Sequence, residues 1–472
     1  MISLVARVRV DRRWGCWLVG ACVALFAGSE LFAQQGQFQG SVPTGTLSPV
    51  PLALTLRDAI DRGLKTNLGL LVSGSASDAS RGERLRALSA LLPQVTGAVT
   101  QNEDQIDLAT YGFSFHFPGI SIPAIVGPFH YTDVRAYGSW SVYDYNLHKN
   151  HLAAKENERA AQLSFKDARD LVVQAAANAY LLVIADSSRV ESLRAQVATD
   201  QAIYDRTADQ KLAGTAAGID VLRSRVELQQ QQQQLVAQRN QFAKDKLALG
   251  RIIGLPLGQD FNIAESVPFS ALTVMTPEEV LRTAYSQRAD YQSAQATVRA
   301  AEASVQAARG ERYPNVGVTA DYGDVGLTLA ESHGTFSFQA AAKFNIFDGE
   351  RIKGDIIQAR AALKQRQDEL DDLRGQIDYQ VRSALLDIQS ASDLVAVARS
   401  NLDLANQTLD QARDRFTAGV TDNIEVVQAQ GSVAIANDNL ISALYAHNIA
   451  KVELARATGS AEQQLQKFME VR

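Results

Sequence analysis

The chain has 472 residues, of which 46% are apolar but only 7% aromatic, with 3 Met and 3 Trp. Its apolar content is therefore mostly Ala, Leu and Val, which is typical of long, closely packed helices. A net charge of -6 and the lack of a basic stripe argue against nucleic acid as a partner. Both cysteines, Cys16 and Cys22, lie near the N-terminus, which excludes disulfides, thiolate metal sites and Cys nucleophiles from the rest of the chain.

The N-terminus has the pattern of an export signal. Four arginines precede an apolar stretch from Trp14 to Ala27, and a polar, Gln-rich segment follows. We expect residues 1–33 to be a signal peptide cleaved after Ala33. The alternative is a lipoprotein box that ends at Cys22, with Cys22 acylated. No later apolar run approaches the ~20 residues of a membrane helix, so a membrane role would require an outer-membrane β-barrel.

The sequence contains one unit twice. An internal repeat constrains the whole architecture, so we identify it before predicting single helices and strands. Thr55 aligns with Thr276 (276 − 55 = 221), and Pro93-Gln94-Val95 aligns with Pro314-Asn315-Val316 at the same shift. Further on, Tyr143-Asp144 aligns with Phe347-Asp348 (348 − 144 = 204), which leaves 17 extra residues in the first copy (221 − 204 = 17). The predicted organisation is an N-terminal linker at 34–54, repeats at 55–254 and 276–459, a linker at 255–275 and a tail at 460–472.

Each repeat is predicted as helix, strand, loop, strand, very long helix, tight turn and long helix. The strands, at about 93–145 and 314–347, alternate apolar and polar residues, as between Phe336 and Ile346. Such alternation fits a barrel around water, although a soluble β-sandwich remains an alternative. Four strands cannot close a barrel alone, so several chains would have to share it. The 17 extra residues, including Phe113–Phe117 and the apolar stretch to Phe129, are expected to form an extracellular loop or hairpin.

The helices are expected to be exceptionally long. Between Arg351 and about Arg413 only Gly354 and Gly375 disfavour helix, so about 62 residues would span roughly 93 Å. Apolar positions step by 3 and 4 along this helix, which is heptad packing. The next helix carries two apolar seams, one through Val433 and Leu440 and one through Val427 and Ile441. A helix with a neighbour on each side indicates a ring of helices.

The turns between the long helices run from Lys211 to Leu222 and from Arg415 to Val427, continuing to Ala429-Gln430. They carry Leu-Ala-Gly or Phe-Thr-Ala-Gly, then an acidic residue before Val. These motifs and the duplicated order resemble the TolC-type outer-membrane efflux proteins over about residues 52–462. The resemblance implies a mostly α, TolC-like trimeric α/β-barrel, with four strands per chain in the outer membrane and helices in the periplasm.

The same resemblance implies partners and site residues. The chain would form a homotrimer in outer-membrane lipid, and a periplasmic adaptor protein would connect it to an inner-membrane pump. The expected tip loops, where the adaptor docks, contain Leu212, Ala213, Gly214, Phe416, Ala418, Gly419 and Thr421. The expected periplasmic constriction contains Glu425, Gln428 and Asp220.

The chain departs from the family pattern at two of these positions. The family often has a second acid three residues after the one matched by Glu425, and here it is Gln428, so the ring would carry less charge. A polar latch between tips would use Asp220 and Phe416, but its basic member falls on Thr421. A simpler interpretation of Asp220 is a helix N-cap.

Enzymatic chemistry is not predicted, because the sequence has no phosphate loop, no Gly-x-Ser-x-Gly and no Cys/His metal spacing. His148 and His151 could share a helix face but lack a third ligand, so neither a metal nor a cofactor is expected. The leading interpretation is a passive outer-membrane exit duct of a tripartite efflux pump or type I secretion system. The rival is a non-conducting, envelope-spanning coiled-coil structural protein. Strands that alternate apolar and polar residues between the helices favour the channel. The sequence does not specify which substrate is carried.

Overall fold

The computed structural model describes residues 38–112, 123–264, 269–270, 276–418, 420, 423–463 and 465. The predicted signal peptide, with Cys16 and Cys22, and the Phe113–Phe117 segment lie outside the described residues. Within them the chain forms two compact units, and both repeats contribute to each. Unit 1 comprises Met1–Ser75, Leu163–Tyr291 and Leu373–Arg472, and unit 2 comprises Ala76–Gln162 and Gln292–Asp372.

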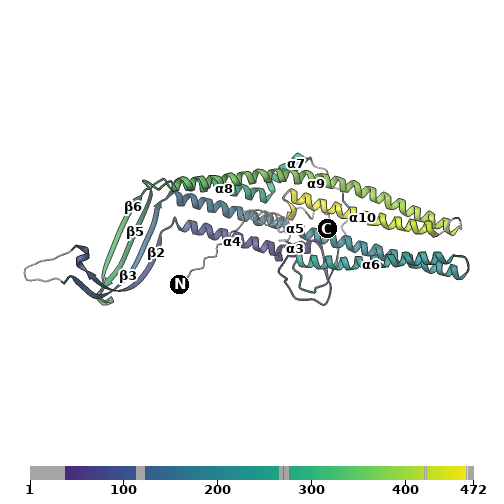
Figure 1. Ribbon diagram of the computed structural model, residues 1–472, viewed down its shortest axis with the longest axis horizontal. Coiled ribbons are helices and arrows are strands. Elements are labelled where there is room, and N and C mark those ends of the chain that lie inside the picture. Colours follow the sequence, from purple (N-terminus) through teal and green to yellow (C-terminus); the bar gives the residue numbers. More distant parts are fainter. Residues whose placement is uncertain are drawn as a thin grey trace, which may run out of the picture. The chain divides into compact units, whose positions relative to one another are not determined.

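The order of elements is the same in the two repeats (Figure 1). The first contains α3 (Leu56–Thr66), α4 (Leu68–Ser89), β2 (Gln94–Asp107), β3 (Ile125–Tyr143), α5 (Tyr145–Leu212) and α6 (Gly218–Ile252). The second contains α7 (Pro277–Gln287), α8 (Ala289–Gly310), β5 (Asn315–Gly326), β6 (His333–Lys343), α9 (Arg351–Thr417) and α10 (Asn423–Ala457). Short 3₁₀ helices, η1 (Leu108–Tyr111) and η2 (Leu329–Glu331), follow β2 and β5.

The first helix of each repeat begins with a capping box. Thr55 precedes α3 and accepts a hydrogen bond from the Asp58 backbone, 3.0 Å from N to Oγ1, while the Asp58 carboxylate accepts from the Thr55 N–H. At α7 the Glu279 carboxylate accepts from the Thr276 backbone at 3.2 Å. This reciprocal arrangement satisfies backbone donors that a helix start leaves free.

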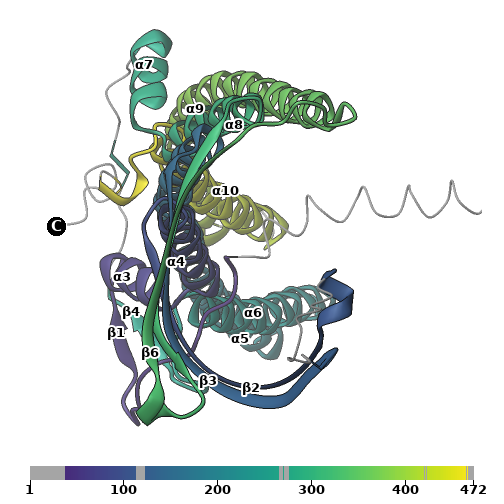
Figure 2. The ribbon, with the colours of Figure 1, turned by 90° about the vertical axis from the view of Figure 1, so that its left-hand side faces the viewer.

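Unit 2 contains a four-stranded antiparallel sheet in the order β2-β3-β5-β6, seen side by side in Figure 1 and as curved strands in Figure 2. The pairing register aligns Ala136, Tyr322 and Phe336 across three strands, and it aligns Tyr137, Asp321 and Ser337 next to them. Because successive side chains of a strand point to opposite faces, one face is apolar and the other polar. The apolar face is exposed within the chain, as at Val95, Phe336 and Phe338.

The strands of the first repeat are longer than expected. β2 and β3 contain 14 and 19 residues, against 12 and 11 for β5 and β6. Ten of the 17 extra residues therefore lie in strands (14 + 19 − 12 − 11 = 10). Phe129, expected in a loop or a hairpin, lies in β3 opposite Asp104, so this part of the insertion extends the hairpin of β2 and β3. In the second repeat β6 ends at Lys343, so Phe344 and Ile346 fall outside the strand.

The core of unit 1 lies where α3, α5, α6 and α10 meet. It includes Leu56, Val173, Tyr180, Leu249 and Val452, each fully or almost fully buried. The Tyr180 hydroxyl donates to the Leu54 carbonyl at 3.0 Å, which satisfies the one polar atom of that buried ring. Leu54 belongs to β1 (Leu52–Leu54), which pairs in parallel with β4 (Phe261–Ile263). Both segments were expected to be linkers, and three-residue strands are too short to show a periodicity.

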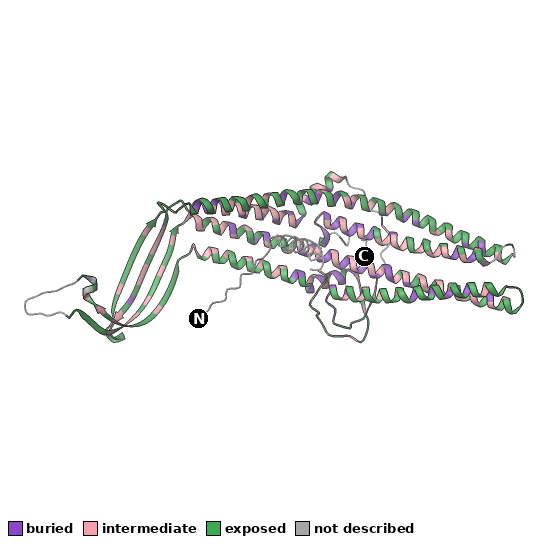
Figure 3. Ribbon diagram, viewed as in Figure 1, coloured by how far each residue is buried: buried purple, intermediate pink, exposed green. Residues whose placement is uncertain are grey.

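The two helical hairpins, α5 with α6 and α9 with α10, are visible as paired ribbons in Figure 1. Helix α9 runs unbroken from Arg351 to Thr417, which confirms the long helix predicted there. Exposed residues alternate with buried ones along both hairpins (Figure 3), as expected for helices that pack through narrow seams. Among the described helices, only α5 is long and apolar enough to cross a membrane by length and composition. Its apolar middle supplies core residues of unit 1, including Val173, Ala177 and Leu181.

Each hairpin returns to the junction between the first two helices of its own repeat. Gly254, just after α6, has φ +65°, and a Cβ there would lie 2.6 Å from the Thr66 Cβ at the end of α3. Gly459, just after α10, has φ +71°, and a Cβ there would lie 2.7 Å from the Arg288 Cα at the end of α7. Glycine allows both the left-handed turn and the close approach. The aligned glycines of the two repeats therefore occupy equivalent places.

Candidate functional site

The first predicted tip is a helix C-cap built around Gly214. The Gly214 N–H donates to the Lys211 carbonyl at 3.0 Å, and the Thr215 N–H donates to the Gln210 carbonyl at 2.9 Å. With Gly214 at φ +74°, this is a Schellman motif, which satisfies the last carbonyls of α5. Leu212 is 88% exposed beside Ala213, so the turn presents an apolar side chain to its surroundings.

The second predicted tip connects α9 to α10. Gly419 and Thr421 lie outside the described residues. The Val420 N–H donates to the Arg415 carbonyl at 2.9 Å, and the Ala418 N–H donates to the Asp414 carbonyl at 3.0 Å. The bond at Val420 spans the same number of residues as the Thr215 bond of the first tip. Val420 is exposed, like Leu212.

Phe416 packs the second tip against the helices that precede and follow it. Its ring packs against a small buried cluster on α9 and α10, namely Leu409, Ala412, Val426 and Ala429. The Arg206 guanidinium of α5 lies 5.7 Å from the centroid of that ring. A cation over an aromatic face is attracted by the ring quadrupole. Phe416 therefore joins the two hairpins of unit 1 within one chain.

Each predicted acidic residue has a cation of the same chain beside it. Glu425, in the first turn of α10, forms an ion pair with Arg415 in the last turn of α9, 3.1 Å from Oε1 to Nη1. Asp220 forms a longer pair with Arg223, 3.6 Å away on the same helix. Gln428 is exposed, one turn after Glu425. The structure thus brings Phe416 and Glu425 to one tip and leaves Asp220 at the other.

The interpretation of Asp220 as an N-cap is wrong. Helix α6 begins at Gly218, its N-cap is Ala217, and that residue makes no side-chain capping bond. Asp220 is the third residue of the helix. A carboxylate there still complements the positive end of the helix dipole, which is a favourable but weaker interaction than a cap.

Two of the buried carboxylates on α5, Asp186 and Asp200, form a feature that was not identified from the sequence. Asp186 is 2% exposed; its Oδ1 accepts from the Gln238 amide of α6 at 3.0 Å and from Arg189 at 3.3 Å. Burial, followed by a hydrogen bond with Asp245 and the charge of Asp245, raises the pKa of Asp186 to about 6. Asp200 is 4% exposed, and burial together with the charge of Glu227 raises its pKa to about 6.

A signal for both residues exists in the heptad pattern. The apolar seam of α5 passes through Val183 and Val190, and Asp186 occupies the seam position between them. Asp200 follows Val197 by three residues in the same way. A carboxylate in a seam position predicts burial, and burial favours its neutral form.

Arg189 extends the Asp186 network to α10. Its Nε lies 3.0 Å from the Asp438 carboxylate, and its Nη2 donates to Ser442 at 2.9 Å. A groove between α5, α6 and α10 opens beside these groups, and Gln196, Gln234, Gln241 and Asn439 also line it. A network of polar side chains therefore connects α5, α6 and α10 within unit 1.

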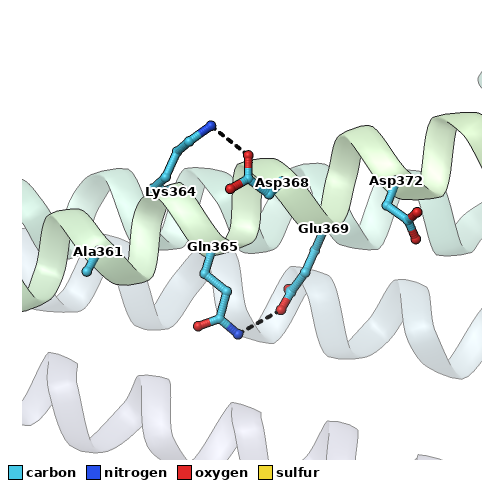
Figure 4. A pocket seen from close by; sticks show the side chains of 6 residues that line it. All are labelled: Ala361, Lys364, Gln365, Asp368, Glu369 and Asp372. Carbon is cyan, nitrogen blue, oxygen red and sulfur yellow. Dashed lines mark hydrogen bonds and ion pairs between the residues drawn. The ribbon is translucent and has the colours of Figure 1, made fainter.

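Another depression on the surface lies along α9 (Figure 4). Lys364 pairs with Asp368 at 2.6 Å, and the Gln365 amide donates to Glu369 at 2.9 Å, each four residues along the helix. Such pairs stabilise an exposed helix face. Asp368 and Glu369 therefore belong to a solvated face of α9. Among the described residues, no three His, Cys, Asp or Glu side chains are grouped to hold a metal ion, and His148 and His151 lack a third ligand there.

Part of the chain matches a known protein family, and about two thirds of it is similar to named proteins. Residues 280–460 match the outer membrane efflux protein family. The cation efflux system protein CusC of Escherichia coli is 22% identical over 324 residues, covering 67% of this chain and 68% of CusC. The toluene efflux pump outer membrane protein TtgC of Pseudomonas putida is 26% identical over 337 residues, covering 66% of this chain and 63% of TtgC. The aligned part thus spans about two thirds of the length of these relatives.

Solved structures show the same fold. The outer membrane protein VceC of Vibrio cholerae superimposes with a TM-score of 0.74 at 18% identity, covering 86% of this chain and 96% of VceC. The MtrE outer membrane channel of Neisseria gonorrhoeae, in its open state, gives 0.73 at 16% identity, covering 91% and 96%. The duplicated helical hairpins and the four-stranded sheet are thus the fold that this chain shares with VceC and MtrE. The second repeat thus carries the match to the outer membrane efflux protein family, which extends over residues 280–460 of the 472.

Proposed function

We propose that this protein is the passive exit duct of a tripartite system and works as a homotrimer. The four-stranded sheet, with one apolar and one polar face, carries the proposal. Its outer strands, β2 and β6, have no further strand partner among the described residues. An exposed apolar face suits lipid, but unpaired strand edges cannot be stable there, because every backbone polar group must be bonded. Pairing β2 of one copy with β6 of the next removes both edges.

The strand directions support this closure. Each neighbouring pair in the sheet is antiparallel, so β2 and β6 run in opposite directions. Copies joined edge to edge would therefore stay antiparallel all the way round. Three copies of four strands give twelve (3 × 4 = 12), more than the roughly eight that a barrel needs to close. The apolar face would then contact lipid and the polar face would line a water-filled lumen.

The tips are proposed as the docking sites of the periplasmic adaptor. Exposed Leu212 and Val420 support this, because each places an apolar side chain on a turn held rigid by backbone hydrogen bonds. We further propose that Glu425 lies at the periplasmic constriction. Its pairing with Arg415 offsets its charge, and Gln428 adds none, so a ring of three Glu425 carboxylates would favour cations only weakly.

The adaptor would connect the duct to an inner-membrane pump that supplies the driving force. The chain itself would therefore perform no catalysis. Its relatives carry different substrates in their names, namely cations for CusC and toluene for TtgC. We propose export of small molecules, with protein secretion as the alternative cargo.

Single-channel recording of the purified trimer in a planar bilayer tests the proposal. The wild type is compared with a double variant, Arg415→Ala with Glu425→Ala, that removes the ion pair of the second tip. Asp410→Ala is the matched control, because its pair with Arg413 is on α9 alone, 3.9 Å apart and away from the turn. Conducting steps from the wild type or the double variant support a duct. Silence from both, in preparations shown to be folded and trimeric, would favour a non-conducting coiled-coil scaffold.

A further inference from the structure

An ion-pair cluster crosses three strands on the polar face of the sheet. Arg135 on β3 places Nε 3.2 Å from the Asp133 carboxylate, pairs through Nη1 with Asp321 on β5, and donates through Nη2 to the Thr335 hydroxyl on β6 at 2.7 Å. The Ser337 hydroxyl donates to the other oxygen of Asp321. Every guanidinium nitrogen thus has a partner, and the side chain is held in one place.

Gly323 makes this reach possible. The register places Arg135 opposite Gly323, and Gly323 opposite Thr335. A Cβ at residue 323 would lie 2.7 Å from both the Cα and the Cβ of Arg135. A glycine in a strand often marks such a close approach of a neighbour. Because residue 323 has no side chain, the arginine can cross over β5 to β6.

The cluster carries an excess of negative charge. Two carboxylates flank one guanidinium, which gives a formal charge of −1 per chain at this level of the sheet. All three side chains are between 14% and 19% exposed, so they are held against the sheet surface and not free in solvent. Neighbouring positions on the opposite face are apolar, such as Val134 and Tyr322.

We propose that Asp133, Arg135 and Asp321 form an anionic belt that sets the ion preference of the barrel lumen, with Arg135 limiting its strength. The inference rests on the proposed function, because it requires several copies with their polar faces turned inward. Three copies would then place three net negative charges around one level of the lumen. Fixed charges that ring a pore raise the local concentration of the opposite ion.

Reversal potentials under a KCl gradient test the belt through the sign of each effect. Arg135→Gln leaves two carboxylates and is expected to raise the K⁺ to Cl⁻ permeability ratio roughly two- to five-fold at about 0.1 M salt. Asp321→Asn leaves a neutral cluster and is expected to lower the ratio by a similar factor. Both differences are expected to shrink at about 1 M salt, where the Debye length falls to about 3 Å.

Two controls separate charge from structure. Arg135→Lys keeps the positive charge but loses the guanidinium group that hydrogen-bonds both Asp133 and Thr335. Because the charge is unchanged, the K⁺ to Cl⁻ permeability ratio is expected to stay at the wild-type value. Asp324→Asn removes the same charge from β5, three residues from Asp321 and on the opposite face. It is expected to leave the ratio unchanged. Heat stability of the trimer is measured in parallel, because a purely structural cluster would lower stability in both charge variants without opposite shifts in selectivity.

The recordings use the wild type, or the Arg415→Ala, Glu425→Ala background if only that conducts. Equal permeability ratios in Arg135→Gln, Asp321→Asn and their parent, in trimers that conduct, would overturn the belt and leave the duct intact. A shift in the same direction for both variants would also overturn it. Silence in every background is instead a failure of the proposed duct.

Discussion

Arg415 and Glu425 meet across the turn between α9 and α10, with Nη1 and Oε1 3.1 Å apart. Arg415 lies in the last turn of the 67-residue helix α9, and Glu425 lies in the first turn of α10. Each side chain has the charge opposite to the partial charge of its own helix end. The Arg415 cation is attracted to the negative C-terminal end of α9, and the Glu425 anion is attracted to the positive N-terminal end of α10. The pair therefore both stabilises the hairpin and reduces the net charge that the tip presents.

Opposite shifts in ion preference are expected from the two partners of this pair. Glu425→Gln removes an anion and should lower the preference for cations, whereas Arg415→Gln exposes the carboxylate and should raise it. Both side chains are substantially exposed, so the free energy of unfolding should change by no more than about 1 kcal/mol. Reversal potentials and thermal melting check this, with Asp410→Asn as the control. Shifts in the same direction for both variants would contradict a charge-based constriction at this position.

The buried carboxylates predict a pH dependence of stability. The pKa of Asp186 is about 6 in the folded chain against an ordinary value of 3.8. Between these values the folded state holds a proton that the unfolded state has released, so the free energy of unfolding falls as pH rises from about 4 to about 6. Above about pH 6 the stability that protonated Asp186 contributes is completely lost. Arg189, Asp245 and Asp438 are the charges that surround Asp186, and Asp200 acts in the same direction as Asp186.

Asp186→Asn should remove the contribution of Asp186 to this dependence, and the double variant with Asp200→Asn should remove that of Asp200 as well, whereas Asp167, Asp170 and His447 still contribute. The amide retains an oxygen that can accept from Gln238 and Arg189. Melting temperatures of the trimer between pH 4.5 and 8 provide the measurement. Asp438→Asn is the control, since that carboxylate also touches Arg189 but is 60% exposed. A difference in melting temperature between the wild type and Asp186→Asn that stays constant through the window would refute the assignment.

Two glycines with the same backbone conformation should respond differently to alanine. Gly214 has φ +74° and nothing within 4 Å of the place that a Cβ would occupy, so Gly214→Ala should cost about 1–2 kcal/mol of left-handed strain. Gly254 has φ +65°, with the Thr66 Cβ 2.6 Å and the Val42 carbonyl 3.0 Å from the corresponding place. Gly254→Ala should therefore cost a further ~1–3 kcal/mol of overpacking.

Denaturant or thermal unfolding of the two glycine variants compares them directly. Gly214→Ala serves as the control for strain without a clash. Equal losses would mean that the junction between α3 and α4 yields to the extra methyl group.

Adjacent residues of β6 should separate the lipid face from the lumen face. Phe338 is 69% exposed on the apolar face, and Gln339 follows it on the polar face. Phe338→Lys should cost about 2–4 kcal/mol near the bilayer midplane and reduce the amount of trimer in the outer membrane. Gln339→Lys should assemble normally. Quantifying heat-resistant trimer in outer-membrane fractions checks this, and equal assembly of the two variants would count against a lipid-facing Phe338.

Much of the architecture is local and so was predictable from the sequence. The duplication, the unbroken helix after Arg351 and the two faces of β6 follow from periodicities that each segment carries within itself. Capping at Thr55 and Thr276 is likewise encoded within four residues. Resemblance of the tip motifs to a known family then indicated the class, and the fold and relatives bear it out.

The tertiary structure decided which distant groups meet. Arg135 contacts Asp321, 186 residues away, and Asp186 accepts from Gln238, 52 residues away. It also decided that Asp220 lies inside its helix and that each repeat is divided between two compact units. The physical reason is that backbone conformation responds to neighbouring residues, whereas burial, ion pairing and the pKa of a carboxylate depend on side chains that only the packed chain brings together.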